Sequence, residues 1–190
     1  MRAVAHAIFL VLAFPAALLC GFGRFTRGFE FFAQTCSLAP ALPGDYLRGA
    51  FYWWTLEEAS LYSRVSFGSF FVNRHVHLGR GVYVGAYCIL GPCRIGEYTL
   101  IASSVQIVSG RRQHPRREDG TLETRSDNRP ISIGDHCWIG AAAIVMEDVG
   151  PGSTVAAGAV VTRPVPAGVT VAGCPARALT QTASAPLDSV

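Results

Sequence analysis

The sequence predicts a mainly β fold, a parallel β-helix that follows an apolar α-helical N-terminal region. The first observation is that aliphatic residues recur at every sixth position. The blocks are Val72, Leu78, Val84 and Leu90, then Ile95, Ile101 and Ile107, then Ile133, Ile139 and Val145, then Val149, Val155 and Val161. This period fits neither a helix, at 3.6 residues per turn, nor an isolated strand. Three such hexads make one triangular turn of about 18 residues, in which every sixth side chain points inward.

The second observation is that a small residue often follows the aliphatic one, as in Val84–Gly85 and Ile139–Gly140. Small residues let the chain bend between flat strands, because glycine tolerates the backbone angles that a corner needs. The repeat shortens between Leu90 and Ile95 and again between Val145 and Val149. We interpret both slips as trimmed corners, since the phase resumes at once.

Composition indicates one soluble domain with an apolar appendage. Of the 190 residues, 15% are charged and 50% are apolar, and the net charge is only +3. A nucleic-acid-binding domain usually concentrates basic charge on one face, so we expect no nucleic-acid partner. The six cysteines form no CxxC pair, and we expect them to be reduced, mostly buried thiols in the cytosol.

The N-terminus contains an almost uncharged stretch, residues 3–20, near the lower length limit for crossing a bilayer. Four interpretations are open: a cleaved signal peptide, a lipoprotein signal at Cys20, a helix that caps the coil, and membrane association. The bulky Leu19 argues against the lipoprotein signal. Arg24, Arg27 and several phenylalanines follow, and such a basic, aromatic flank suits a membrane interface. We therefore favour a cytoplasmic protein associated with the cytoplasmic face of the inner membrane.

These patterns divide the chain into three regions. Residues 1–64 form the apolar N-terminal helical region and a possible membrane anchor, with one or two short helices in residues 45–64. Residues 65–178 form the β-helix domain, and residues 179–190 form a polar tail that we expect to be flexible. The six-residue repeat stops at an excursion loop, residues 108–130. Long loops in compact folds are usually functional or disordered, so we expect the chemistry to lie there.

Three segments carry a resemblance to a known family: Ile133–Gly140, Ala157–Thr162 and Val171–Arg177. Together with the hexads, they resemble the hexapeptide-repeat acyltransferases over about residues 65–178. The phrase Ser109–His114 is most similar to O-acetyltransferases of colanic acid and other surface polysaccharides. The resemblance implies a left-handed β-helix, acetyl-CoA as the acyl donor, and homotrimers whose active sites form between subunits.

The same resemblance implies a catalytic role for His114, because family members use a histidine of such a loop to take the proton from the acceptor. Neutral imidazole near pH 7 can accept a hydroxyl proton as the oxygen attacks a thioester carbonyl. Neighbouring arginines would oppose a charged imidazolium and could bind an anionic acceptor or the phosphates of coenzyme A. They are Arg111, Arg112, Arg116 and Arg117. The candidates for a carboxylate that orients the ring are Glu118, Asp119 and Glu123.

For the donor, the family binds acetyl-CoA in a groove between coils, largely through backbone groups. The matching positions are Gly140, Ala141, Ala157 and Gly158. Small residues allow a thin ligand to approach, and backbone N–H groups can hold its carbonyl oxygen. The resemblance places Trp138 along the pantetheine arm, although a corner-wedged indole is an alternative, and it places Arg163 and Arg177 at the nucleotide end.

For the acceptor, galactoside and maltose members of the family have an Asn two turns before the base. The comparable stretch here is Gly85–Cys88, which offers Tyr87 and Cys88 but no Asn. We expect instead a sugar hydroxyl of a surface-polysaccharide or glycolipid precursor, with Arg111 and Arg112 among its contacts. An acyl-carrier-protein-dependent acyltransferase and a non-catalytic scaffold remain alternatives.

A metal site is not expected. His75 and His77 share one face of a hexad, where they could in principle bind a metal ion. Metal-dependent carbonic anhydrases with the same coil use two histidines five residues apart, and this sequence has no such His-x4-His pair.

Overall fold

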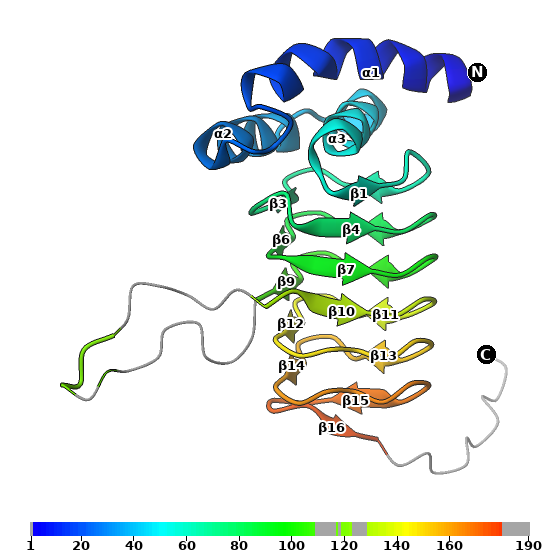
Figure 1. The fold of residues 1–190 in the computed structure, drawn as a ribbon. Coiled ribbons are helices and arrows are strands. Elements are labelled where there is room, and N and C mark those ends of the chain that lie inside the picture. Colours follow the sequence, from blue (N-terminus) through cyan, green and yellow to red (C-terminus); the bar gives the residue numbers. More distant parts are fainter. Residues whose placement is uncertain (1, 109–116, 118, 123–128, 180–190) are drawn as a thin grey trace, which may run out of the picture.

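Figure 1 shows the computed structural model, in which a column of stacked coils carries three helices across its N-terminal end. The structure describes residues 2–108, 117, 119–122 and 129–179. The helices are α1 (Arg2–Leu19), α2 (Thr26–Ser37) and α3 (Ala41–Thr55). Helix α1 lies outermost, with α2 and α3 between it and the coil.

Three sheets form the sides of the coil. Sheet A contains β1 (Glu58–Ala59), β4 (Val76–Leu78), β7 (Cys93–Ile95) and β10 (Ile131–Ile133). Sheet B contains β2 (Arg64–Val65), β5 (Tyr83–Val84), β8 (Leu100–Ile101), β11 (Trp138–Ile139), β13 (Thr154–Val155), β15 (Thr170–Ala172) and β16 (Arg177–Ala178). Sheet C contains β3 (Phe70–Phe71), β6 (Ile89–Leu90), β9 (Gln106–Ile107), β12 (Ile144–Val145) and β14 (Val160–Val161).

Successive coils pair in parallel, and among the described strands only β16 runs antiparallel, where it turns back on β15. The hexad residues are the core. In sheet B, Val84, Ile101, Ile139 and Val155 hold matching register positions and are each fully buried. This parallel solenoid with a helical N-terminal region confirms the predicted fold class and is consistent with a left-handed β-helix.

One position of the predicted repeat is wrong. Phe71 rather than Val72 points into the coil, because Phe71 pairs with Leu90 and is fully buried, whereas Val72 is 37% exposed. The reason lies at the helical end. Tyr52 of α3 meets the Phe71 ring edge-on, with 4.9 Å between ring centroids, so the coil presents an aromatic residue where it contacts the helices.

Buried hydroxyl groups link one coil to the next at the corners. The Ser69 hydroxyl donates to the carbonyl of Gly85 at 2.6 Å and accepts the N–H of Cys88 at 2.8 Å. Thr99 and Ser153 make the same pair of contacts further along the coil. All three residues are fully buried. Their hydrogen bonds satisfy backbone groups that would otherwise be costly to bury.

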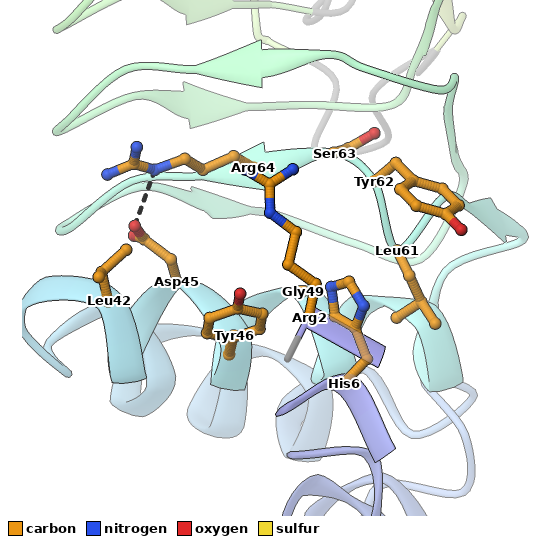
Figure 2. Close-up of a pocket in the computed structure, with 10 residues that line it drawn as sticks. All are labelled: Arg2, His6, Leu42, Asp45, Tyr46, Gly49, Leu61, Tyr62, Ser63 and Arg64. Carbon is orange, nitrogen blue, oxygen red and sulfur yellow. Dashed lines mark ion pairs between the residues drawn. The ribbon is translucent and has the colours of Figure 1, made fainter. Parts of the chain in front are cut away.

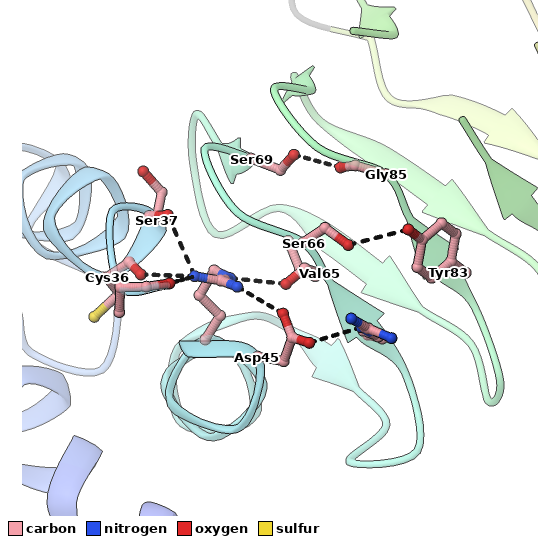
Figure 3. A network of polar contacts seen from close by, with 11 residues as sticks. Cys36, Ser37, Asp45, Val65, Ser66, Ser69, Tyr83 and Gly85 are labelled. Atoms are coloured by element: carbon pink, nitrogen blue, oxygen red, sulfur yellow. Dashed lines mark hydrogen bonds and ion pairs between the residues drawn. The ribbon is translucent and has the colours of Figure 1, made fainter. Parts of the chain in front are cut away.

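The helical end is fastened to the coil by Arg48 of α3, whose side chain is fully buried. Its guanidinium donates to the carbonyl of Val65 in β2 at 2.7 Å and to the carboxylate of Asp45 at 2.7 Å. Further acceptors are the carbonyls at and just after the end of α2, those of Cys36, Ser37 and Ala39. These carbonyls carry the partial negative charge of a helix C-terminus, which suits a cation. Figure 3 shows the acceptors converging from α2, α3 and β2.

Candidate functional site

The excursion loop leaves the coil between β9 and β10, at the corner between sheets C and A. The coil continues across it without loss of register: β9 pairs with both β6 and β12, and β10 pairs with β7. The coil therefore keeps its register on both sides of the loop. His114, Arg111 and Arg112 lie outside the described residues, as do Arg116, Glu118 and Glu123.

A short turn within the loop is described. The N–H of Gly120 donates to the carbonyl of Arg117 at 3.0 Å, and the N–H of Arg117 donates to the carbonyl of Thr121 at 2.8 Å. The Asp119 carboxylate accepts the hydroxyl and the N–H of Thr121, at 2.6 and 2.8 Å, and these hydrogen bonds lower the pKa of Asp119. Asp119 is thus engaged in holding its own turn.

The returning end of the loop is tied to the next coil by an exposed ion-pair cluster. Arg129 contacts the carboxylates of Glu147 at 3.2 Å and Asp148 at 3.0 Å. Asp148 also accepts the N–H of Ser132, the middle residue of β10, at 2.8 Å. Sequence reasoning missed this cluster, because its partners are far apart in the chain and meet only when one coil lies on the next.

The corner between sheets B and C contains the small residues that the resemblance assigned to the donor. The N–H of Gly140 donates to the carbonyl of Val155 at 2.7 Å, and the N–H of Gly158 donates to the carbonyl of Ala141 at 2.8 Å. A methyl group on Gly140 would overlap the backbone of Ala157. Close stacking of the coils thus requires glycine at position 140.

Two backbone donors are left over at this corner. Ala141 and Ala157 are exposed, and neither N–H group makes a hydrogen bond within the described part of the chain. They occupy equivalent positions in successive coils. The corner can therefore offer two N–H groups, free of side-chain bulk, to a thin ligand that carries carbonyl oxygens.

Trp138 lies beside this corner on the outer face of sheet B, where its side chain is 57% exposed. It pairs with Leu100 of β8 on one side and Thr154 of β13 on the other. Leu100 is 50% exposed, and Tyr83 follows it on β5. Trp138 thus belongs to an exposed apolar ladder instead of being wedged into a corner, and the ladder offers a surface to a ligand or to another subunit.

Arg163 and Arg177 come together at the C-terminal end of the coil. Both line one depression of about 170 Å³, together with Pro164, Val171 and Ala176. Arg177 donates to the carbonyl of Ala176 at 3.0 Å. The two guanidinium groups suit an anionic ligand such as a phosphate.

The two residues predicted for the acceptor have different surroundings. Tyr87 sits at a coil corner with a positive φ of 59° and is 61% exposed, and its ring packs edge-on against Phe67. Cys88 is fully buried, and its thiol lies 3.1 Å from the carbonyl of Ala102. Burial raises the pKa of the Cys88 thiol. The prediction that Cys88 contacts the acceptor is corrected accordingly, because its side chain belongs to the core.

His75, just before β4, and His77, within β4, each contact carboxylates. His75 Nδ1 lies 2.7 Å from Glu57, and His77 lies 3.2 Å from Glu57 and 3.0 Å from Glu58. The hydrogen bond from His75 is the main cause of the lowered pKa of Glu57. No group of three or more His, Cys, Asp or Glu side chains that could hold a metal ion occurs among the residues that the structure describes.

Part of this coil matches a known protein family in sequence. The family model for the hexapeptide repeat of succinyl-transferase matches residues 130–163. A 2,3,4,5-tetrahydropyridine-2,6-dicarboxylate N-acetyltransferase from Staphylococcus aureus is 48% identical over 64 residues, 33% of this chain and 26% of the relative. The bifunctional protein GlmU from Corynebacterium jeikeium is 32% identical over 96 residues, 48% of this chain and 20% of the relative. The chain thus spans about a quarter or less of the length of these relatives.

Solved structures show the same fold over most of the chain. A maltose O-acetyltransferase from Clostridium difficile has a TM-score of 0.66 at 19% identity, and the match covers 82% of this chain and 87% of that one. A galactoside acetyltransferase in complex with coenzyme A has a TM-score of 0.64 at 22% identity, covering 83% and 82%. A hexapeptide-repeat acetyltransferase from Vibrio cholerae has a TM-score of 0.64 at 21% identity, covering 82% and 91%. Another structure of the Vibrio cholerae protein contains acetyl coenzyme A.

Proposed function

We propose that this chain, a hexapeptide-repeat protein with the fold of the hexapeptide-repeat acetyltransferases, transfers an acetyl group from acetyl-CoA to a sugar hydroxyl. The observation that carries the proposal is the excursion loop. It interrupts the repeat while β9 and β10 keep their register with the coils on either side. An insertion that the coil does not need for its own packing is available for chemistry.

In the proposed reaction, neutral His114 takes the proton of the acceptor hydroxyl as its oxygen attacks the thioester carbonyl. A carbon–oxygen bond forms and the carbon–sulfur bond breaks. Coenzyme A leaves with the electron pair of the broken bond and takes up the proton that the imidazole carries. Arg111 and Arg112 precede His114 by three and two residues. Their positive charges disfavour the charged imidazolium and so favour the neutral, proton-accepting form of the ring.

The donor site is proposed at the corner between sheets B and C. The N–H groups of Ala141 and Ala157, which have no acceptor among the described residues, would hold carbonyl oxygens of the donor, and Gly140 and Gly158 add no side chain to this corner. Trp138 would line the pantetheine arm from the outer face of sheet B. Arg163 and Arg177, which share one depression, would meet the phosphates of the nucleotide.

The acceptor, the oligomer and the location are finer parts of the proposal. We infer a surface-polysaccharide or glycolipid precursor as the acceptor, with Tyr87, Arg111 and Arg112 near it. A homotrimer would place the loop of one subunit beside the groove of the next, and the exposed ladder of Trp138 and Leu100 supports a surface covered in an assembly. The enzyme would work at the cytoplasmic face of the membrane, where such lipid-linked precursors are available.

The first test measures acetyl-CoA binding by thermal shift on wild type and His114→Ala, with His136→Asn as the matched control. His136 is an exposed corner histidine with a φ of 54°, a backbone conformation that asparagine tolerates. A ligand at a hundredfold excess over its Kd stabilises the folded state by about 2.7 kcal/mol. We expect acetyl-CoA to stabilise all three proteins equally, because the donor groove does not include either histidine.

The second test measures acetyl transfer to lipid-linked glycan precursors. We expect His136→Asn to match wild type and His114→Ala to be slower by about 10²–10⁴-fold, the usual contribution of a general base. Stabilisation without transfer by wild type would contradict the acceptor class. Absence of stabilisation in every protein would remove acetyl-CoA as donor and favour an acyl-carrier-protein enzyme or a scaffold.

A further inference from the structure

A second cavity lies at the opposite end of the molecule from Arg163 and Arg177, where α1, α3 and the first coil meet. It has a volume of about 250 Å³. Its lining comes from three segments. Arg2 and His6 belong to α1, and Asp45 and Tyr46 belong to α3. Tyr62 lies just before β2, and Arg64 is the first residue of β2. Figure 2 shows these side chains converging from the three segments.

The cavity is positively charged overall. Its one carboxylate, Asp45, is already shared between Arg64 at 2.7 Å and the buried Arg48 at 2.7 Å. Arg2 has no ion-pair partner among the described residues. Outside the lining, Arg80 lies over the ring of Tyr62 at 5.0 Å. The balance of these groups favours an anion, and a guanidinium group binds phosphate oxygens well.

Aromatic rings line the rest of the cavity. His6 meets Tyr46 edge-on with 5.2 Å between ring centroids, and it meets Tyr62 at 6.2 Å. Phe9 also stacks on Tyr46, with 5.5 Å between ring centroids. These contacts hold the first two turns of α1 against α3, so the cavity is built by packed rings and not by one mobile side chain.

The outer surface beside this cavity is an unpartnered apolar helix face. Figure 1 shows α1 lying across the end of the coil as the outermost layer. Its 18 residues have a mean hydropathy of 2.0, and only 11% of them are buried. The exposed large side chains along it are Val4, Ile8, Val11, Leu12, Phe14, Leu18 and Leu19.

Helix α1 is also held in place along its length. The indole N–H of Trp54 in α3 donates to the carbonyl of Leu10 at 3.1 Å, and the rings of Phe14 and Trp54 meet at 5.3 Å. Ala13 and Ala17, both buried, allow close approach to the layer below. A helix fixed this way presents one long apolar side outward, which suits lying on a bilayer.

We propose that the N-terminal end docks on an anionic lipid bilayer, with α1 lying flat in the interface and the Arg2–Arg64 cavity receiving a lipid phosphate. Charge complementarity selects the anionic surface, because residues 2–55 contain four arginines, Arg2, Arg24, Arg27 and Arg48, against two acids, Glu30 and Asp45. An interfacial helix sinks about 5–10 Å into the headgroup boundary, so headgroups beside α1 stand level with the cavity beneath its first turn. This inference is independent of His114 and of acetyl transfer.

The experiment is co-sedimentation of the full chain with phosphatidylcholine vesicles, either pure or containing phosphatidylglycerol. Wild type should bind the anionic vesicles more strongly than the neutral ones. Val11→Asp, which places a charge at a position 73% exposed on the outer face, should lose binding to both. Arg2→Gln and Arg24→Gln should each weaken binding to anionic vesicles about fivefold, the effect of one basic residue near the surface.

A soluble headgroup then separates the cavity from general surface charge. We expect glycerol 1-phosphate to raise the unfolding temperature of wild type and Arg24→Gln but not of Arg2→Gln. Equal stabilisation of Arg2→Gln would overturn the cavity assignment. Stabilisation by inorganic phosphate without vesicle binding would indicate a free-anion site and overturn the lipid assignment.

Two further outcomes would reject the docking surface. Val11→Asp could lower the oligomer mass while it binds vesicles as wild type does, or while wild type itself binds no vesicles. Either result would mean that a second copy of the chain covers the apolar face. If protein made in cells stays in membranes after alkaline carbonate extraction, α1 spans the bilayer and does not lie on it. Acetyl-CoA binding, measured on the same variants, stays intact in either case, so failure of this inference is distinguishable from failure of the proposed function.

Discussion

The coil and the helical end are stabilised in different ways. In the coil, each turn repeats the same contacts: an aliphatic residue such as Ile139 stacks between Ile101 and Val155 in neighbouring turns. In the helical end, contacts are not repeated: Arg48 donates to carbonyls of β2 and of the end of α2, and Tyr52 packs against Phe71. A repeated contact can be weakened in one turn and kept in the others, whereas a unique contact has no substitute.

This difference predicts that the largest loss of stability comes from the helical junction. Arg48→Met should lower the free energy of unfolding by about 3–5 kcal/mol, because it removes one partner of a buried charge pair and leaves carbonyls without a donor. Chemical denaturation followed by tryptophan fluorescence and circular dichroism measures the change. Arg94→Met, on the exposed outer face of β7, should stay within about 0.5 kcal/mol of wild type.

A second variant separates charge from geometry at the same position. Arg48→Lys keeps the positive charge but lacks the planar fork that serves acceptors on α2, α3 and β2 together. It should fall between wild type and Arg48→Met. A lysine variant as stable as wild type would show that charge alone fastens the helical end.

The coil should lose somewhat less from a single truncation. Ile139→Ala removes most of a fully buried side chain from β11 and should cost about 2–5 kcal/mol. Leu100→Ala, on the exposed outer face of the neighbouring strand, should cost less than about 1 kcal/mol in a monomer and more in the proposed homotrimer. A cost for Leu100 near that of Ile139 would mean that the outer ladder is buried against another subunit in solution.

The same difference explains how much of the molecule could be predicted from the sequence. The coil was predictable because a period of six leaves a regular trace of inward residues, and only the coil in contact with the helices departs from it, at Phe71. The Arg48 junction was not predictable, since its acceptors lie on three separate elements and have no shared spacing. An arginine in an apolar segment gives no sign of which carbonyl groups it will meet.

The candidate site divides along similar lines. The place of Gly140 and Ala157 in the coil could be predicted from the repeat, and the corner that they share follows from it. Whether the N–H groups of Ala141 and Ala157 find a partner among the described residues depends on how the coils stack, which residue type does not reveal. Cys88 was misplaced because a cysteine near a corner can face either side of the sheet, and here its thiol is buried beside the carbonyl of Ala102.

Two glycines of the donor corner test the stacking itself, with a smaller expected effect. Gly140→Ala would push a methyl group into the backbone of Ala157, and we expect a loss of about 2–3 kcal/mol. Gly158→Ala meets no atom within 4 Å, but its φ of 68° is strained for alanine, so we expect about 1 kcal/mol. Thermal unfolding of both variants measures the order. A larger loss at Gly158 would mean that backbone conformation, not coil spacing, limits this corner.

The smallest effect is expected where the helical end passes into the coil, at Glu57. The hydrogen bond from His75 lowers the pKa of Glu57 in the folded protein below its ordinary value. A carboxyl group shifted this way stabilises the fold at pH values above its unfolded pKa, and the contribution is lost as the pH falls through the lower folded value. Wild type should therefore lose stability on acidification more steeply than Glu57→Gln, and Glu97→Gln, an exposed position after β7 that does not contact His75, serves as the control. Because Glu57 and His75 are both well exposed, the difference should be only a few tenths of a kcal/mol, as for other surface pairs.

Unfolding midpoints measured between about pH 3 and pH 7 test this difference in acid dependence. If the acid dependence is identical in all three proteins, the hydrogen bond between His75 and Glu57 does not contribute to stability.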